Sequence, residues 1–290
     1  MTEKHVTVPM LRGMKKKGEK IVMLTAYDFT FAALMEQAEI DILLVGDTLG
    51  MIVQGHDTTL PVTVDDVIYH TRAVKRAAKR AMVVADMPFL SYQITPEEAV
   101  HNAGRLMKEG GADAVKVEGG RATAAAIRHM TTAGIPVMGH VGLGPQSSKL
   151  LGGHKVQGKT AASVRALLQD ALAVEQAGAF SMVIEAVPWP VARHITGQAS
   201  IPTIGIGAGP YCDGQVLVFA DMLGLFTAFQ PHFVRRFVQM GEEAVQAFQA
   251  FRNSVREGSF PTLDESYSVD DTVLQVLDES KKQSPDINWG

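Results

Sequence analysis

The sequence predicts a (β/α)8 barrel, because buried strands and helices alternate along a chain of suitable length. The chain has 290 residues and is 46% hydrophobic, which suits one large α/β domain, since such barrels commonly run to about 250 residues. Short apolar runs rich in branched residues, such as 42–45, are typical of parallel strands buried on both faces. Eight strand–helix units in one chain favour a closed barrel over an open sheet.

The predicted strands follow one another at regular intervals, separated by helix-capping residues, glycine and proline. In chain order the expected strands are 21–26, 41–47, 82–88, 114–119, 136–140, 180–185, 202–207 and 216–221. The expected helices are 29–37, 63–78, 95–110, 123–133, 161–178, a short one opening at 188–190, and 232–252. Thr95-Pro96 followed by acids signals a helix start, since a cap residue, an early proline and early acids favour helix N-termini.

Internal repetition supports the same fold. The segments Glu36–Asp47, Glu109–Glu118 and Glu175–Glu185 each contain a helix end, a small residue, a buried strand and an acid. We expect the barrel domain to span residues 1–263 and residues 264–290 to form an acidic C-terminal extension, in which 270–280 could be a short helix. The basic run Lys15–Lys17 indicates a solvated face.

Composition argues against several classes of protein. The net charge is −4 without a long basic run, so we expect no nucleic-acid partner. No stretch approaches the roughly 18 apolar residues of a membrane helix, and the polar N-terminus lacks the apolar core of a signal peptide. Cys212 is the only cysteine, so an intrachain disulfide is impossible. We therefore expect a cytoplasmic protein without a membrane partner.

Acids stand at the strand ends, where barrels of this kind carry their chemistry. Asp47, Asp86 and Glu118 end three consecutive predicted strands, and neighbouring strands lie about 4.8 Å apart. Three converging carboxylates repel one another unless a cation lies among them. All-oxygen ligands favour a hard divalent ion, above all Mg²⁺, whereas the nine histidines show no paired spacing typical of zinc.

Three more residues complete the predicted site. Lys116 and Glu118 are two residues apart and therefore face the same side of their strand, into the barrel. Glu185 lies on the sixth strand, across the barrel from the second, with His140 between the two walls. A 2-oxo acid that chelates the metal would turn its C3 hydrogens toward Glu185, which would act as the base that forms a Mg²⁺-stabilised enolate.

Structural interpretations of the same residues stay open. One acid at a strand end is often a helix cap or a surface ion pair, and Asp221 could simply cap the last unit. Lys116 could be a structural partner of Asp113 or Glu118, and His140 could be a hydrogen-bonded core histidine. Polar residues at five successive strand ends are harder to explain in this way.

Two glycine-rich motifs approach nucleotide-binding patterns. GHKVQGKT at 153–160 matches the P-loop, which would make the chain a nucleotide-binding protein, but that motif requires a strand immediately before it. Residues 147–152 precede it instead, so we expect a lid over the barrel mouth. GIGAGP at 205–210 fails the dinucleotide pattern because Pro210 replaces the last glycine. Its glycines would let a ligand or a neighbouring backbone approach closely.

Seven segments occur in this order: VGDTLGM (45–51), VQGHDTTLPV (53–62), ADMPF (85–89), VKVEGG (115–120), GHVGL (139–143), GGHKVQG (152–158) and IGIGAG (204–209). They resemble the 3-methyl-2-oxobutanoate (ketopantoate) hydroxymethyltransferase family over about residues 5–267. The resemblance implies a barrel of the phosphoenolpyruvate/pyruvate superfamily type. It also implies hydroxymethyl transfer from 5,10-methylenetetrahydrofolate to 3-methyl-2-oxobutanoate, forming 2-dehydropantoate in pantothenate biosynthesis. Members of the family are typically homo-oligomers, often decamers.

The resemblance also implies roles for individual residues. The Mg²⁺ positions are Asp47, Asp86 and Glu118, the proton acceptor is Glu185, and the keto-acid contacts are Asp47, Thr48, Asp86, Lys116 and His140. Ala220, where the family usually has histidine, and His232, before Phe233, depart from the pattern. The alternatives are another Mg²⁺-dependent 2-oxo acid lyase or mutase of the superfamily, or a non-catalytic barrel. Cys212 lies outside any lid loop, which counts against an isocitrate-lyase-like enzyme.

Overall fold

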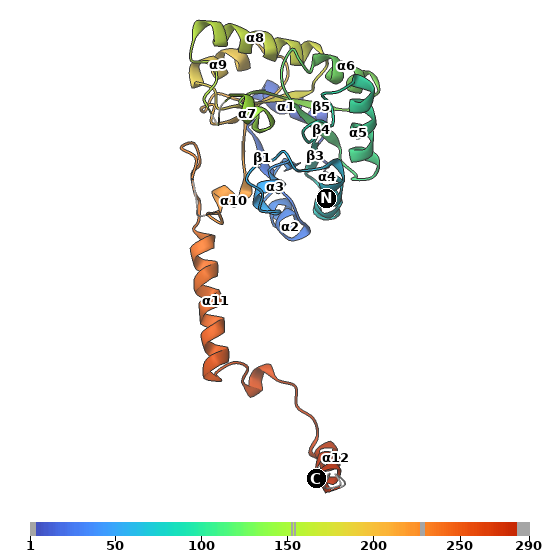
Figure 1. Cartoon of the computed structure of the whole chain (residues 1–290), viewed down its shortest axis with the longest axis vertical. Helices are drawn as coiled ribbons and strands as arrows, with labels where there is room; N and C mark the ends of the chain where they lie inside the picture. Colours follow the sequence, from blue (N-terminus) through green and yellow to red (C-terminus); the bar gives the residue numbers. More distant parts are fainter. Residues whose placement is uncertain (1–3, 152, 154, 227–229, 283–290) are drawn as a thin grey trace, which may run out of the picture. The chain divides into compact units, whose positions relative to one another are not determined.

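The eight strands predicted from the apolar runs close into a parallel barrel. The computed structural model describes residues 4–151, 153, 155–226 and 230–282. Each strand pairs with the next, and β8 returns to β1. Figure 1 shows the strands of the barrel unit with helices such as α5, α6 and α8 around them. The strands are β1 (Ile21–Thr25), β2 (Ile42–Val45), β3 (Met82–Asp86), β4 (Ala114–Glu118), β5 (Val137–Gly142), β6 (Ser181–Glu185), β7 (Thr203–Ile206) and β8 (Gly214–Leu217). The predicted fold class is thereby confirmed.

The helices between the strands begin at the capping residues that the sequence indicated. The side chain of Thr95 accepts a hydrogen bond from the Glu98 amide, and Thr63 forms a capping box with Asp66. The helices of the barrel unit are α1 (Val8–Lys17), α2 (Phe29–Gln37), α3 (Leu49–Ile52), α4 (Val64–Ala77), α5 (Pro96–Lys108), α6 (Ala124–Thr132), α7 (Ser148–Leu151), α8 (Ala161–Gln176), α9 (Trp189–Gln198) and α10 (Phe219–Met222).

Both faces are buried on strands such as β2 and β3, which explains their unbroken apolar runs, whereas β1 and β8 each carry one exposed residue. On β2, Leu43 packs in the cluster shared with the surrounding helices, whereas Ile42 and Leu44 belong to a second cluster contributed mainly by alternate strand residues. Val6 and Leu11, before and within α1, join this second cluster. Each buried branched side chain contributes about 1.5–3 kcal/mol. Apolar side chains therefore fill most strand positions, and Lys116 within β4 is buried beside acids.

The strand register brings the predicted site residues side by side. Asp86 on β3 aligns with Lys116 on β4. Glu118 at the end of β4 aligns with His140 on β5. Glu185 on β6 lies opposite Gly142 at the end of β5. The register thus forms a continuous polar arc along the rim of the barrel from β3 to β6.

The eighth unit differs from the prediction. Strand β8 ends at Leu217, and Asp221 lies in the short helix α10 rather than at a strand end. The apolar residues after Leu217 suggested a longer strand, but the Phe219 amide donates to Thr25 Oγ1 and the chain turns into α10. Ala220 is buried in that helix, whereas His232 is exposed.

The N-terminal segment also differs from the prediction. Residues 8–17 form α1, which the sequence did not suggest. Of the three lysines expected on a solvated face, Lys16 and Lys17 are exposed as predicted. The Lys15 side chain is only 16% exposed, and its Nζ lies 2.7 Å from Asp213 Oδ2. The lysine therefore joins α1 to the residue directly before β8.

The C-terminal part of the chain forms a unit of its own. The chain forms two compact units, Met1–Gln239 and Met240–Gly290, while the predicted division at residue 263 stays a prediction. The helix expected over 232–252 is α11 (Met240–Glu257). Its predicted start was wrong because Phe233 packs against Gly207 and the Phe237 amide donates to Met222 O. In the second unit, α12 (Asp271–Lys282) covers the predicted short helix.

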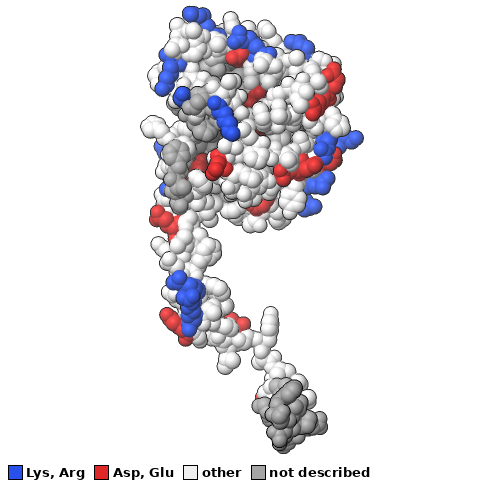
Figure 2. All heavy atoms as spheres, viewed as in Figure 1, with Lys and Arg blue, Asp and Glu red and all other residues white. Residues whose placement is uncertain are grey.

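The P-loop-like stretch lacks the required setting. Strand β5 ends at Gly142, and helix α7 precedes the motif instead of a strand. Gly152 and His154, two residues of the expected lid, lie outside the described residues. Within the described part of the chain, every helix is too short or too polar to span a membrane. On the face shown in Figure 2, lysine and arginine are interspersed with aspartate and glutamate.

Candidate active site

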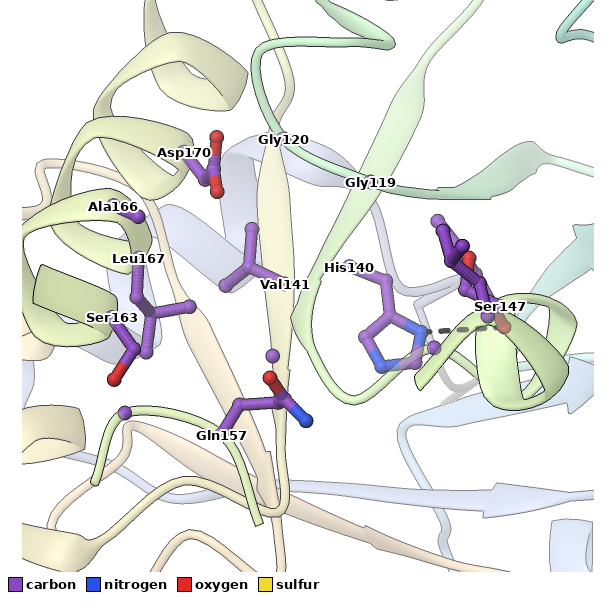
Figure 3. Close-up of a pocket in the computed structure, with 15 residues that line it drawn as sticks. Gly119, Gly120, His140, Val141, Ser147, Gln157, Ser163, Ala166, Leu167 and Asp170 are labelled. Atoms are coloured by element: carbon purple, nitrogen blue, oxygen red, sulfur yellow. Dashed lines mark ion pairs between the residues drawn. The ribbon is translucent and has the colours of Figure 1, made fainter. Parts of the chain in front are cut away.

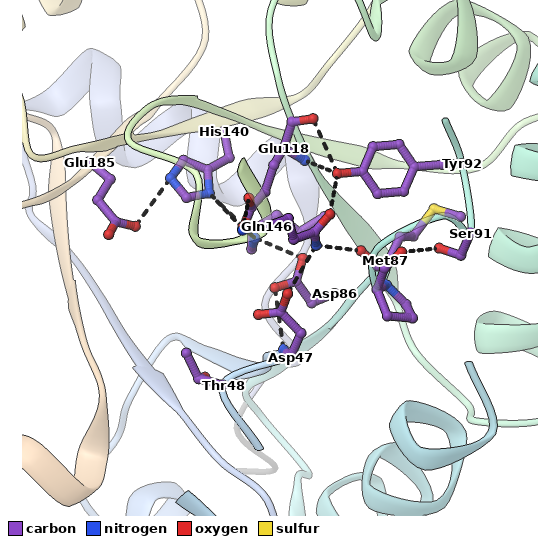
Figure 4. Close-up of polar contacts among 12 residues, drawn as sticks. Asp47, Thr48, Asp86, Met87, Ser91, Tyr92, Glu118, His140, Gln146 and Glu185 are labelled. Atoms are coloured by element: carbon purple, nitrogen blue, oxygen red, sulfur yellow. Dashed lines mark hydrogen bonds and ion pairs between the residues drawn. The ribbon is translucent and has the colours of Figure 1, made fainter. Parts of the chain in front are cut away.

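The three predicted acids converge at the carboxyl ends of β2, β3 and β4 (Figure 4). One oxygen from each of Asp47, Asp86 and Glu118 lies within 4.8 Å of the others. Their exposed fractions are 2%, 2% and 6%, respectively. The predicted convergence is therefore present, in a setting almost closed to solvent.

Burial makes the negative charge of these acids costly. It raises the pKa of Asp47 well above its usual range, and the charges of Asp86 and Glu118 raise it further. Burial also raises the pKa of Asp86, to about 6, although Lys116 opposes the shift. Burial would raise the pKa of Glu118 too, but the Lys116 ammonium and the contacts with His140 outweigh it and lower that pKa.

Lys116 places a buried positive charge beside the acids. Its Nζ lies 2.7 Å from Asp86 Oδ1 and 3.6 Å from Glu118 Oε1, and the residue is 3% exposed. Burial disfavours the ammonium form, but the surrounding acids outweigh this effect and raise the pKa of Lys116 above its usual range. Asp113, one of the two structural partners considered from the sequence, pairs with Lys75 instead.

His140 connects the acids to Glu185. Its Nδ1 lies 3.6 Å from Glu118 Oε1, and its Nε2 lies 3.2 Å from Glu185 Oε2. Burial and the Lys116 charge lower the pKa of His140, but contacts with Glu118 and Glu185 outweigh them and raise it to about 9. The imidazole therefore lies between two carboxylates on opposite sides, as the sequence predicted.

Thr48 follows Asp47 directly and contacts a residue that the sequence did not single out. Its Oγ1 lies 2.6 Å from the hydroxyl of Tyr27, which is 1% exposed. Burial raises the pKa of Tyr27 above its usual range, so the phenol keeps its proton at neutral pH. Tyr27 lies just after β1, where an aromatic residue looks like core, and only its hydroxyl group hinted at another role.

Gln146 and Tyr92 are two further site residues that the sequence did not reveal. The side-chain Nε2 of Gln146 donates to Asp47 Oδ2 at 3.0 Å, and its backbone N–H donates to Glu118 Oε2 at 3.2 Å. Tyr92 donates its hydroxyl proton to Gln146 Oε1 at 2.8 Å. Both residues lie in loops without hydrophobic periodicity, so no pattern identified them.

A cavity of about 310 Å³ lies beside Glu118 and His140 (Figure 3). Val141 and Leu167 form apolar parts of its wall, and Asp170 of α8 also lines it. The cavity provides space next to the polar arc at the end of the barrel.

The donor set fits a hard divalent cation. It consists of carboxylate oxygens, which Mg²⁺ prefers. Oδ1 of Asp86 is buried and has no aligned hydrogen bond within the described residues, although Lys116 Nζ is 2.7 Å away. The Lys116 ammonium and a protonated His140, which Glu118 shares with Glu185, leave the negative charge of these four acids incompletely balanced. A divalent ion would correct this imbalance.

Comparisons with known proteins point to one family. The family model described as ketopantoate hydroxymethyltransferase matches residues 5–263. The chain is 53% identical over 264 residues to 3-methyl-2-oxobutanoate hydroxymethyltransferase of Syntrophus aciditrophicus (strain SB), covering 91% of this chain and 97% of the relative. It is also 53% identical over 270 residues to the enzyme of that name from Heliobacterium modesticaldum, covering 93% and 98%.

Solved structures share the fold at low identity. A 2,3-dimethylmalate lyase, described as a member of the PEP mutase/isocitrate lyase superfamily, superposes with a TM-score of 0.55 at 18% identity, covering 95% of this chain and 96% of that one. A phosphonopyruvate hydrolase in complex with oxalate and Mg²⁺ gives a TM-score of 0.59 at 12% identity, covering 97% and 98%. These matches show that the barrel fold is shared.

Proposed function

The chain belongs to the ketopantoate hydroxymethyltransferase family, and from this premise we propose that it transfers a hydroxymethyl group from 5,10-methylenetetrahydrofolate to 3-methyl-2-oxobutanoate, forming 2-dehydropantoate. The supporting observation is the arrangement of its acids. Asp47, Asp86 and Glu118 form a compact oxygen cluster. Glu185 stands apart from them, linked through His140. One set of carboxylates can therefore hold a metal while another accepts a proton.

Asp47, Asp86 and Glu118 would hold Mg²⁺, and Lys116 and His140 would contact the keto acid with them. When bound, Mg²⁺ would polarise the 2-oxo group and thereby make a C3 proton easier to remove. Thr48 would hold the substrate carboxylate, with its hydroxyl oriented by Tyr27 at 2.6 Å.

Glu185 would accept the C3 proton. The electron pair left on C3 would form a new bond to the one-carbon unit of the folate as the first of its two C–N bonds breaks and that nitrogen takes a proton. Water would then form the C–O bond as the second C–N bond breaks, which leaves the hydroxymethyl group on C3 and releases tetrahydrofolate. His140 Nε2, 3.2 Å from Glu185 Oε2, would keep that carboxylate oriented toward the substrate. General-base catalysis of this kind contributes typically about 10²–10⁴-fold to the rate.

The proposed activity is tested by incubating the protein with Mg²⁺, 3-methyl-2-oxobutanoate and 5,10-methylenetetrahydrofolate, and measuring 2-dehydropantoate by mass spectrometry. We expect product from the wild type and at least about 100-fold less from Glu185→Gln. Glu175→Gln is a matched control, because Glu175 bonds to Ser200 outside the site, and it should form product at the wild-type rate. Absence of folate-dependent product from the wild type would contradict the proposal.

We also propose that the protein forms a homo-oligomer, as its family resemblance implies. Helix α11 has no buried residue, and Phe248 and Phe251 on it are 71% and 60% exposed. Large exposed apolar side chains on one helix favour association. Sedimentation velocity should give a mass several times that of the 31.2 kDa chain, and a monomer at micromolar concentration would contradict the proposal.

A further inference from the structure

Gln146 lies in the connection that follows β5 and reaches into the carboxylate cluster (Figure 4). It is 5% exposed and forms part of a single 3₁₀ turn, Pro145–Ser147. Its Nε2 donates to Asp47 Oδ2 at 3.0 Å and to Met87 O at 2.9 Å. A buried amide with this many partners is held in one orientation.

The opposite end of the same amide meets hydrogen-bond donors. Oε1 accepts from the Tyr92 hydroxyl at 2.8 Å and from Gln93 Nε2 at 3.1 Å. Because acceptors surround Nε2 and donors surround Oε1, the amide orientation follows from its partners. The Gln146 side chain can therefore offer only N–H groups to Asp47.

The main chain of Gln146 contacts a second acid of the cluster. Its amide donates to Glu118 Oε2 at 3.2 Å. Tyr92 supports the same acid, because its hydroxyl accepts from the Glu118 amide at 3.1 Å. One residue thus contacts two carboxylates, from the ends of β2 and β4, that repel each other.

We propose that Gln146 is a positioning residue for the divalent cation, holding one oxygen of Asp47 and one oxygen of Glu118 so that the other oxygens face the metal. Within the described residues, Asp47 Oδ1 receives no hydrogen bond, whereas Oδ2 receives the bond from Gln146. Glu118 Oε1 lies 3.6 Å from both Lys116 Nζ and His140 Nδ1. Its Oε2 accepts from the backbone N–H of Gln146.

This proposal rests on the metal site proposed above, but it concerns affinity rather than turnover. Partners that orient metal ligands typically change metal affinity by about 10–100-fold when they are removed. Glutamine suits the position because it donates to the acids without adding charge. Glutamate there would place another acceptor against Asp47 Oδ2 and Met87 O.

The test measures Mn²⁺ binding to metal-depleted protein by electron paramagnetic resonance of the free ion, without substrate. Gln146→Met keeps the length of the side chain but removes its donors, and Gln146→Glu keeps an acceptor for Tyr92. For both variants we expect a Kd for Mn²⁺ about 10–100-fold above the wild-type value. Gln157→Met is the matched control, since the Gln157 side chain bonds only to Lys155 O within the described residues, and its Kd should be unchanged.

The outcomes separate the possible failures. If the wild type binds no Mn²⁺, both the proposed metal site and the proposed role of Gln146 are wrong. If the wild type binds and both Gln146 variants bind within threefold of it, the metal site stands and the role of Gln146 is wrong. Circular dichroism establishes folding, and loss of the fold in both variants would also overturn the proposal, because it would assign Gln146 to folding instead.

Discussion

Removing Lys116 should destabilise the metal-free protein strongly. Lys116→Met leaves the buried carboxylates of Asp86 and Glu118, 2.7 and 3.6 Å from the lost ammonium, without their cation. Breaking a buried pair by removing one partner costs about 3–5 kcal/mol. For a unit of this size each kcal/mol shifts the thermal midpoint by about 2–4 °C, so we expect a decrease of about 6–20 °C in EDTA.

The decrease should depend on pH with a definite sign. Burial already raises the pKa of Asp86 to about 6 in the presence of Lys116, and removing the lysine raises it further. A folded-state pKa above the unfolded value means that the native state binds more protons, so stability falls as pH rises through the folded pKa. The variant should therefore lose more stability at pH 8 than at pH 5.5.

The assay is differential scanning fluorimetry in EDTA at both pH values. Lys75→Met is the matched control, because Lys75 also lies 2.7 Å from an acid, Asp113, but is 31% exposed. An ion pair exposed to that extent contributes only about 0–1 kcal/mol. Adding Asp86→Asn to Lys116→Met should recover part of the loss. A midpoint for Lys116→Met equal to that of Lys75→Met, or independent of pH, would refute the reasoning.

Three further predictions concern metal binding, packing at two glycines and orientation of the substrate. Mg²⁺ binding should release protons, because the raised pKa values of Asp47 and Asp86 leave the metal-free cluster partly protonated near pH 6. Calorimetry in buffers of different ionisation enthalpy measures this release, and identical heats would contradict it. Gly139→Ala should destabilise the protein by about 1–3 kcal/mol, because the new Cβ would lie 2.2 Å from a side-chain carbon of Val174. Gly104→Ala in helix α5 has open space around it and should stabilise the protein by up to about 1 kcal/mol. Thermal unfolding of both variants checks these opposite signs. Tyr27→Phe removes the 2.6 Å contact with Thr48 and should raise KM for the keto acid by about 2–12-fold, the equivalent of 0.5–1.5 kcal/mol, and an unchanged KM in steady-state kinetics would exclude that orienting role.

The barrel and the position of its acids were predictable because strand burial leaves a direct signal. Asp86 ends the apolar run of β3, and Glu118 ends β4, which is apolar except for Lys116. Parallel strands bring consecutive ends to one rim. The same logic placed His140 between Glu118 and Glu185. The catalytic and metal-binding roles of these residues remain proposals.

Residues that act from loops were not predictable in this way. Gln146 reaches Asp47 across 99 positions in the chain, from a turn without hydrophobic periodicity. Of the two acids that pair with Lys116, Glu118 was considered from the sequence and Asp86 was missed. Asp86 becomes its neighbour only through the register of β3 with β4. The limits of β8 were wrong because a tertiary hydrogen bond to Thr25 ends the extended segment before the apolar residues do.

The central claim is that Glu185 removes a proton from C3 of a keto acid activated at the carboxylate cluster. Its most direct test is deuterium exchange at C3 of 3-methyl-2-oxobutanoate in D₂O with Mg²⁺ and without folate, followed by proton NMR. The wild type should exchange and EDTA should stop the exchange, while Glu185→Gln should bind the keto acid but exchange about 10²–10⁴-fold more slowly. Exchange by Glu185→Gln at the wild-type rate would contradict the claim.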